Sequence, residues 1–125
     1  MTKISSGLKT LFLVHFVVGL VFGLLYLLIP GVFLKLVGMP VPDEIPYRII
    51  GAAVLAFTAS SWYCYQAAEW ERVKIVVIAE IVWTALNVVV GLYGLIFAGM
   101  AAAEWINVVI MAGFAAAFSY FYTRK

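Results

Sequence analysis

Charged residues are scarce in this chain. Lysine, arginine, aspartate and glutamate make up 11% of the 125 residues, whereas hydrophobic residues make up 66%. A typical soluble domain carries about 25% charged residues, so this composition excludes an ordinary water-soluble domain. The formal net charge of +2 is also too small and too dispersed for a nucleic-acid-binding surface, and we expect no nucleic-acid partner.

Cysteine and histidine occur once each, as Cys64 and His15. A lone cysteine excludes an intramolecular disulfide, a redox pair and a cysteine-based zinc site, and we expect it to be a small packing residue. One histidine cannot supply two axial haem ligands. The sequence also has no nucleophile at a recognisable spacing from a base and no phosphate-binding glycine loop. We therefore expect no metal, no other cofactor and no enzymatic activity.

Long apolar runs fill the rest of the chain, over residues 8–29, 47–68, 73–97 and 101–122. About 20 apolar residues suffice for a helix to cross a hydrocarbon core of roughly 30 Å. Only helices and closed barrels satisfy their backbone groups in lipid, and the runs lack the alternation of barrel strands. Short connections make neighbouring helices antiparallel. We predict an all-α integral membrane protein, with residues 1–125 forming one domain of four transmembrane helices in an up-down bundle.

The long first connection follows Pro30 and Gly31. Residues 32–37 are apolar but too short to span, and we expect them to lie at the membrane interface as one or two helical turns. Asp43 is the expected N-cap of the next helix, with Pro46 tolerated in its first turn.

Positive charges are unevenly distributed between the two sides of such a bundle. The side with both termini has six lysines or arginines and the other side has two, so the positive-inside rule places both termini in the cytoplasm. We expect an integral protein of a prokaryotic cell membrane. The six are Lys3, Lys9, Arg72, Lys74, Arg124 and Lys125, and the two are Lys35 and Arg48.

Small residues recur every four positions within the runs, as at Gly19 and Gly23. Close backbone approach at small residues is a packing device of membrane helices. Two interpretations remain open: packing between helices of one chain, or a face through which two copies form a homodimer. The lipid bilayer is the other expected partner.

Glu80 lies inside the third run, about 10 Å from its cytoplasmic end at 1.5 Å per residue. A charged group near the bilayer centre is costly, by roughly 2.5–3.5 kcal/mol on insertion scales, and therefore faces protein or water. Glu80, Thr84, Asn87 and Gly91 share one face of the helix. We expect this polar stripe to point into the bundle.

His15 is the expected partner of Glu80, because it lies at the same depth in the first run. Ser60 or Ser61 in the second run reaches a similar level, so we predict a buried cluster of His15, Ser60 or Ser61, Glu80 and Thr84. Histidine changes charge near neutral pH, so the pair could exchange a proton. Three interpretations remain: a polar pair that only fixes helix register, a ligand or proton site that includes Asn87, or no contact between the two side chains.

A second polar set opens the second and fourth runs at the outer end. Arg48 begins one helix, while Glu104 and Asn107 lie one turn apart at the start of the other. We expect an Arg48–Glu104 ion pair between these helices. Interfacial charges need no functional role, so this pair is expected to be structural.

Several short segments resemble a known group of proteins. The segments are Ile29-Pro30-Gly31, Leu36-Val37-Gly38-Met39-Pro40, Tyr47-Arg48-Ile49-Ile50-Gly51-Ala52 and Trp105-Ile106-Asn107-Val108-Val109. Together they resemble small prokaryotic four-helix membrane proteins of the DoxX-like kind. The resemblance covers most of the chain, implies the four-helix fold and carries over no catalytic residue.

The sequence is compatible with two functions. The first is a small membrane protein that binds a lipid, a small apolar ligand or a membrane partner through the buried polar site. The alternative is a proton-coupled transporter of small molecules acting as a homodimer. Small multidrug-resistance exporters are similar in length and helix count, but their essential glutamate belongs in the first helix, where this chain has His15.

Overall fold

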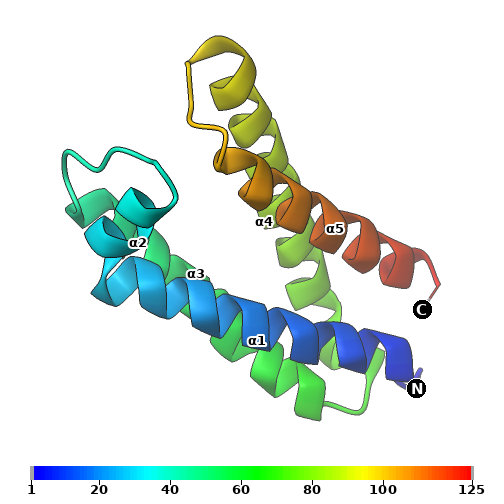
Figure 1. The fold of residues 1–125 in the computed structure, drawn as a ribbon. Coiled ribbons are helices and arrows are strands. Elements are labelled where there is room, and N and C mark those ends of the chain that lie inside the picture. The colour runs from blue at the N-terminus through cyan, green and yellow to red at the C-terminus, as the bar shows by residue number, and fades with distance from the viewer. Residues whose placement is uncertain (1, 125) are drawn as a thin grey trace.

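The computed structural model describes residues 2–124, and α-helices account for most of them (Figure 1). Three of these helices are long and apolar enough to cross a membrane: α1, α4 and α5. This result supports a membrane-integral helical protein. The helices are α1 (Ser6–Leu28), α2 (Pro30–Leu36), α3 (Ile45–Gln66), α4 (Trp70–Phe97) and α5 (Glu104–Thr123).

The fourth expected span corresponds to α3, which is not among these three helices. It has 22 residues, enough to cross, but its second half carries Thr58, Ser60, Ser61 and Gln66. These side chains lower its hydropathy below that of the other long helices. The four-span bundle predicted from the sequence is therefore not confirmed by apolar length alone.

Local chemistry sets the helix boundaries. The Ser5 hydroxyl accepts a hydrogen bond from the Leu8 backbone N–H at 3.2 Å and caps α1. The helix ends before Pro30, which has no N–H to donate. The turn of helix expected within 32–37 is present as α2, with Pro30 at its start. Asp43 accepts the Ile45 N–H at 3.0 Å, but Glu44 occupies the N-cap position itself, one residue later than predicted.

The boundaries of the last two helices differ from the predicted runs. α4 begins at Trp70, three residues early, because the extended N-terminal segment pairs with the α3–α4 connection. The Trp70 N–H donates to the Thr2 carbonyl at 2.8 Å, and the Ile4 N–H donates to the Ala68 carbonyl at 3.0 Å. α5 begins at Glu104, three residues late, after a connection that turns at Gly99 with φ +65°.

The helices form two pairs, α1 with α3 and α4 with α5. Figure 1 shows that the pairs lie close together at one end, which holds both termini and the α3–α4 connection, and diverge toward the other. We call these the terminal end and the α2 end. Within each pair the two helices are antiparallel, as predicted. The two pairs splay apart toward the α2 end, so the four long helices are not evenly packed.

The packed core lies at the terminal end. It includes Cys64, whose expected role as a small packing residue is confirmed. Phe12 and Phe118 pack with tilted rings whose centroids are 5.6 Å apart, and they join the two pairs there. The core consists of Leu8, Phe12, Cys64, Trp70, Val73, Val77, Phe114 and Phe118.

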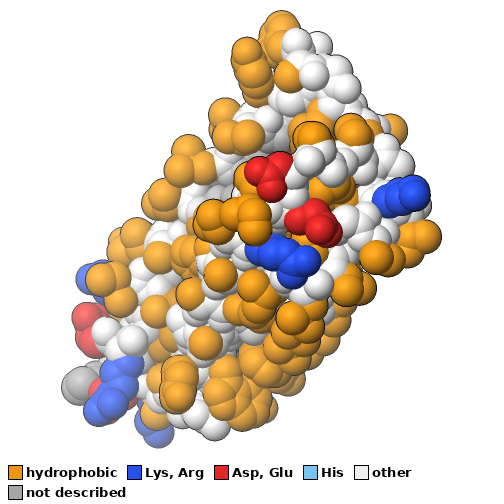
Figure 2. All heavy atoms as spheres, turned by 90° about the vertical axis from the view of Figure 1, so that its left-hand side faces the viewer, with side chains coloured by type: hydrophobic (Ala, Val, Ile, Leu, Met, Phe, Trp, Pro, Cys, Tyr) orange, Lys and Arg blue, Asp and Glu red, His pale blue; other side chains and the backbone are white. Residues whose placement is uncertain are grey.

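Apolar side chains also cover much of the outer surface. Figure 2 shows hydrophobic atoms across most of one face, with charged side chains gathered in separate groups. Val17 and Val21 on α1 and Val89 on α4 are each more than half exposed. Soluble monomers rarely expose such continuous apolar area, so this surface fits contact with acyl chains.

Glycines allow α1 and α3 to approach closely. A Cβ atom on Gly51 would lie 2.6 Å from the Leu27 nitrogen and 2.9 Å from the Gly23 oxygen, both backbone atoms of α1. Gly19 and Gly23 are buried against Thr58 and Leu55 of α3. These glycines therefore serve packing within one chain, and the homodimer stays a prediction.

We expect Gly51→Ala to lower the free energy of unfolding by about 1–3 kcal/mol, the usual effect of overpacking. The new methyl group meets backbone, which cannot rotate away. Gly113→Ala is the matched control, because nothing lies within 4 Å of the added Cβ. Unfolding in mixed micelles, followed by circular dichroism, measures both variants. Equal stability of the two would contradict the close approach of α1 and α3.

Candidate functional site

Glu80 on α4 is completely buried, with 0% of its surface exposed. Thr84 and Gly91 on the same face are buried as well, and Asn87 is half-buried. The expectation that this polar stripe points into the protein is confirmed. The carboxylate is shielded from lipid, as the cost of a charge in hydrocarbon demands.

His15 contacts this carboxylate from α1. Its Nε2 lies 3.1 Å from Oε2 of Glu80, and its Nδ1 lies 2.7 Å from Oγ of Ser61 on α3. The rings of Phe114 and Phe118 on α5 meet the imidazole edge to face, with centroids at 4.8 and 5.8 Å. One side chain of α1 therefore touches all three other long helices.

The contacts of His15 constrain the protons of this centre. Neither carboxylate oxygen of Glu80 has a hydrogen bond of good geometry within residues 2–124, so the imidazole contact is mainly electrostatic. A net charge buried here would lack compensation, whereas one proton shared between imidazole and carboxyl leaves the pair neutral. With that proton on either group, Ser61 satisfies Nδ1. The centre therefore places an acid and a base side by side in a site shielded from lipid.

The other hydroxyl groups of the predicted cluster bond to their own helices. Thr84 donates to the Glu80 carbonyl at 2.6 Å, and Ser60 donates to the Phe57 carbonyl at 2.7 Å. Of the two serines left open by the sequence, Ser61 is the one that reaches His15. The centre thus consists of His15, Ser61 and Glu80.

The expected Arg48–Glu104 ion pair is wrong. The Arg48 guanidinium donates to the Leu27 and Leu28 carbonyls at 2.6 and 3.2 Å and lies 3.9 Å from Glu44. Those carbonyls close α1, where Pro30 prevents the helix from continuing, so Arg48 satisfies acceptors that would otherwise lack a partner. Glu104 instead accepts a hydrogen bond from Asn107 Nδ2 at 2.8 Å.

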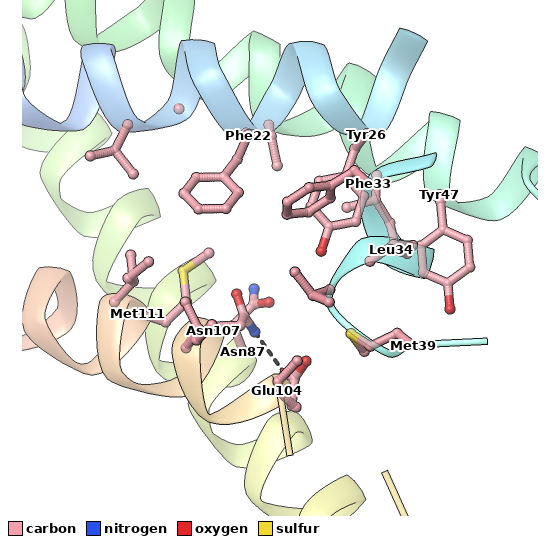
Figure 3. Close-up of a pocket in the computed structure, with 18 of the residues that line it drawn as sticks. Phe22, Tyr26, Phe33, Leu34, Met39, Tyr47, Asn87, Glu104, Asn107 and Met111 are labelled. Carbon is pink, nitrogen blue, oxygen red and sulfur yellow. Dashed lines mark hydrogen bonds between the residues drawn. The ribbon is translucent and has the colours of Figure 1, made fainter. Parts of the chain in front are cut away.

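A cavity of about 240 Å³ lies between the two helix pairs, where they diverge toward the α2 end. An apolar cavity of about 150 Å³ is already large enough to hold benzene. Figure 3 shows Phe22, Tyr26 and Phe33 on one side and Asn87, Asn107 and Met111 on the other, all facing the same space. His15 belongs to the lining, so the polar centre borders this cavity.

The cavity reaches the apolar surface of the protein. Ile50, Met100 and Ile106 line it and are also exposed, Ile106 by 54%. Its polar lining is confined to a few groups, namely His15, Asn87, Glu104, Asn107 and the two tyrosines Tyr26 and Tyr47. Such a combination, mostly apolar with a few placed polar groups, is typical of small-molecule sites.

The aromatic lining was missed by the sequence analysis. Trp83 stacks on Phe57 across α3 and α4 at 5.1 Å, and Tyr26 stacks on Tyr47 at 6.2 Å. In a chain with 16% aromatic residues, no single ring stands out by position. An available signal was the four-residue spacing of Phe22 and Tyr26, which places both on one face of α1.

No family model, no curated protein and no solved structure matches this chain. The resemblance to DoxX-like membrane proteins therefore stays a prediction. Within the described part of the chain, no three histidine, cysteine, aspartate or glutamate side chains are placed to hold a metal ion.

We expect His15→Leu to destabilise the protein, because it leaves Glu80 buried without its partner; an unsatisfied buried group costs about 1–3 kcal/mol. Adding Glu80→Leu should restore part of this loss, because both polar groups are then gone. Unfolding in mixed micelles for the two single variants and the double variant gives the coupling energy. Additive effects would contradict an energetic link between His15 and Glu80.

Proposed function

We propose that this chain is a four-span integral membrane protein that binds a lipid or another small apolar ligand between its two helix pairs. The observation that carries the proposal is the cavity of about 240 Å³, which is lined by apolar and aromatic side chains and borders the His15–Glu80 centre. It also opens toward an apolar surface, from which a lipid-soluble molecule could enter.

The packing of α3 against α1 favours α3 as the fourth span. α3 lies along α1 with close backbone approach at Gly51, so a membrane that surrounds α1 also surrounds α3. The polar side chains of α3 do not require water there. Thr58 donates to the Val54 carbonyl and Ser61 bonds His15, so these hydroxyl groups are satisfied inside the protein.

Four spans put both termini on one side of the membrane. Lys3, Lys9, Arg72, Lys74 and Arg124 lie on helices or connections near the terminal end. The positive-inside rule favours the cytoplasm for that end. We therefore propose that both termini are cytoplasmic in a prokaryotic cell membrane, and that the role is binding rather than catalysis.

Proton-coupled transport by a homodimer is the weaker alternative. A proton site at His15 and Glu80 would favour it, but a substrate path must also reach the terminal end. Phe12, Val77 and Phe118 are fully buried there and close that route. Ligand binding needs no such path.

Reporter fusions test the topology. We expect a cytoplasmic reporter, such as a green fluorescent protein, to be active at both the N- and the C-terminus, because four crossings return the chain to its starting side. A periplasmic reporter, such as alkaline phosphatase, should be inactive at both positions and active after residue 40. Three spans would place the two termini on opposite sides, and opposite results at the two termini would refute the proposal.

Photolabelling tests the cavity. A photoreactive decanol, carrying a diazirine on its chain, should label cavity residues saturably in phosphatidylcholine nanodiscs. Met111→Trp places a bulky ring in the cavity, and we expect it to lower labelling about tenfold, equivalent to about 1.4 kcal/mol of binding.

Val109→Trp is the matched control, since Val109 lies on the same helix, is 66% exposed and does not line the cavity. Its labelling of cavity residues should equal that of the original chain. Labelling that never saturates and maps only to exposed faces, identified by mass spectrometry of the labelled peptides, would refute ligand binding in the cavity.

A further inference from the structure

We propose that the ligand of this cavity is an amphiphilic organic cation, whose positive head group lies between Glu104 and the Tyr26–Tyr47 pair while its apolar tail extends toward His15. This inference rests on the proposed function, because it names the chemical class of ligand for the same cavity. It follows from a buried acidic group for which residues 2–124 provide no positive partner.

Glu104 lies in the cavity wall at the start of α5 and is only 9% exposed. Its Oε1 accepts one hydrogen bond, from Asn107. No lysine, arginine or histidine within residues 2–124 forms an ion pair with it, since the acidic partners in the ion pairs are Glu80, Glu44 and Glu69. Buried carboxylates are almost always paired, so this one lacks its counter-charge.

The position of Glu104 favours its negative charge. It occupies the first turn of α5, where the positive end of the helix dipole favours an anion. The Asn107 amide donates a hydrogen bond to it. Gly91 lets α4 pack tightly here, because a Cβ atom on it would lie 2.8 Å from Oε1 of Glu104. The carboxylate is therefore held in place before any ligand binds.

Aromatic rings form the wall opposite Glu104 (Figure 3). Tyr26 stacks with Tyr47 at 6.2 Å, with an interplanar angle of 16°, and meets Phe33 edge to face at 5.7 Å. Tyr26 and Glu104 line the same cavity from opposite walls. Aromatic faces attract organic cations, so the acid and the rings select the same kind of head group.

The remaining lining explains why the ligand is amphiphilic. Beyond Glu104 the cavity continues between Val18, Phe57 and Ile110 toward His15. These side chains suit an alkyl or aryl tail. A small inorganic cation would need several oxygen ligands to replace its hydration shell, whereas the lining is mostly apolar and has a single carboxylate at this end. An anionic ligand would be repelled by Glu104.

Competition against the photoreactive decanol tests the charge of the ligand. The probes are decyltrimethylammonium, used below its micellar concentration, and its uncharged carbon isostere, 2,2-dimethyldodecane. In Glu104→Gln we expect the half-maximal competing concentration of the cation to rise about tenfold, equivalent to about 1.4 kcal/mol, and that of the isostere to stay unchanged. Because membrane partitioning of each probe is the same for both proteins, the ratio between proteins isolates the effect of Glu104.

Two further variants make the result specific. Glu44→Gln removes a carboxylate at the same end of the protein but outside the cavity lining, and it should leave both competition curves unchanged. Tyr26→Leu keeps an apolar side chain and removes the aromatic face. It should raise the value for the cation about threefold, and it provides an independent test if Glu104→Gln does not fold.

The outcomes separate this inference from the proposed function. If the cation competes equally well with the original chain, Glu104→Gln and Tyr26→Leu while decanol labelling remains saturable, the inference is overturned and the proposed function stands. If decanol labelling is not saturable in the original chain, both are overturned. A selective loss of cation competition in Glu104→Gln, absent from Glu44→Gln, supports both.

Discussion

The imidazole of His15 holds the four long helices in one arrangement. It lies 2.7 Å from the Ser61 hydroxyl and 3.1 Å from the Glu80 carboxylate, and Phe114 packs against its face. Apolar side chains gain little by leaving lipid for protein, because acyl chains are equally apolar. A buried acid, by contrast, has few acceptable positions. The placement of Glu80 beside His15 therefore fixes the relative depth of α1 and α4, and the neighbouring core then packs around that contact.

The same reasoning explains why the two helix pairs separate at the α2 end. Within each pair, glycines such as Gly51 and Gly91 allow close contact. Between the pairs, the fully buried core lies at the terminal end, on the far side of His15 from α2. α2 folds back so that Phe33 packs against Phe22 and Tyr26 of α1, which leaves the space toward α4 and α5 open. A gap in a membrane protein can be occupied by acyl chains, so no strong force closes it.

The sequence predicted the polar centre well because depth is readable from helix length. His15 lies nine residues after Ser6, and Glu80 lies ten after Trp70, so the two meet although both helices start earlier than expected. The splay and the cavity could not be predicted, because hydropathy does not distinguish a face that meets protein from one that meets lipid. The Arg48 error has a different cause. Opposite charges suggested an ion pair, but the carbonyls freed before Pro30 were the nearer acceptors.

Two polar groups of different character thus border one cavity. At the inner end, Glu80 has the basic side chain of His15 beside it at 3.1 Å, so its charge can be compensated inside the protein. At the α2 end, Glu104 has a neutral amide partner and a helix N-terminus, which favour its charge without cancelling it. Both carboxylates are buried by the same fold, yet of these two only Glu80 has a basic partner among residues 2–124. For the proposed ligand, this asymmetry would place the apolar tail toward the His15–Glu80 pair and the positive head toward the uncompensated acid.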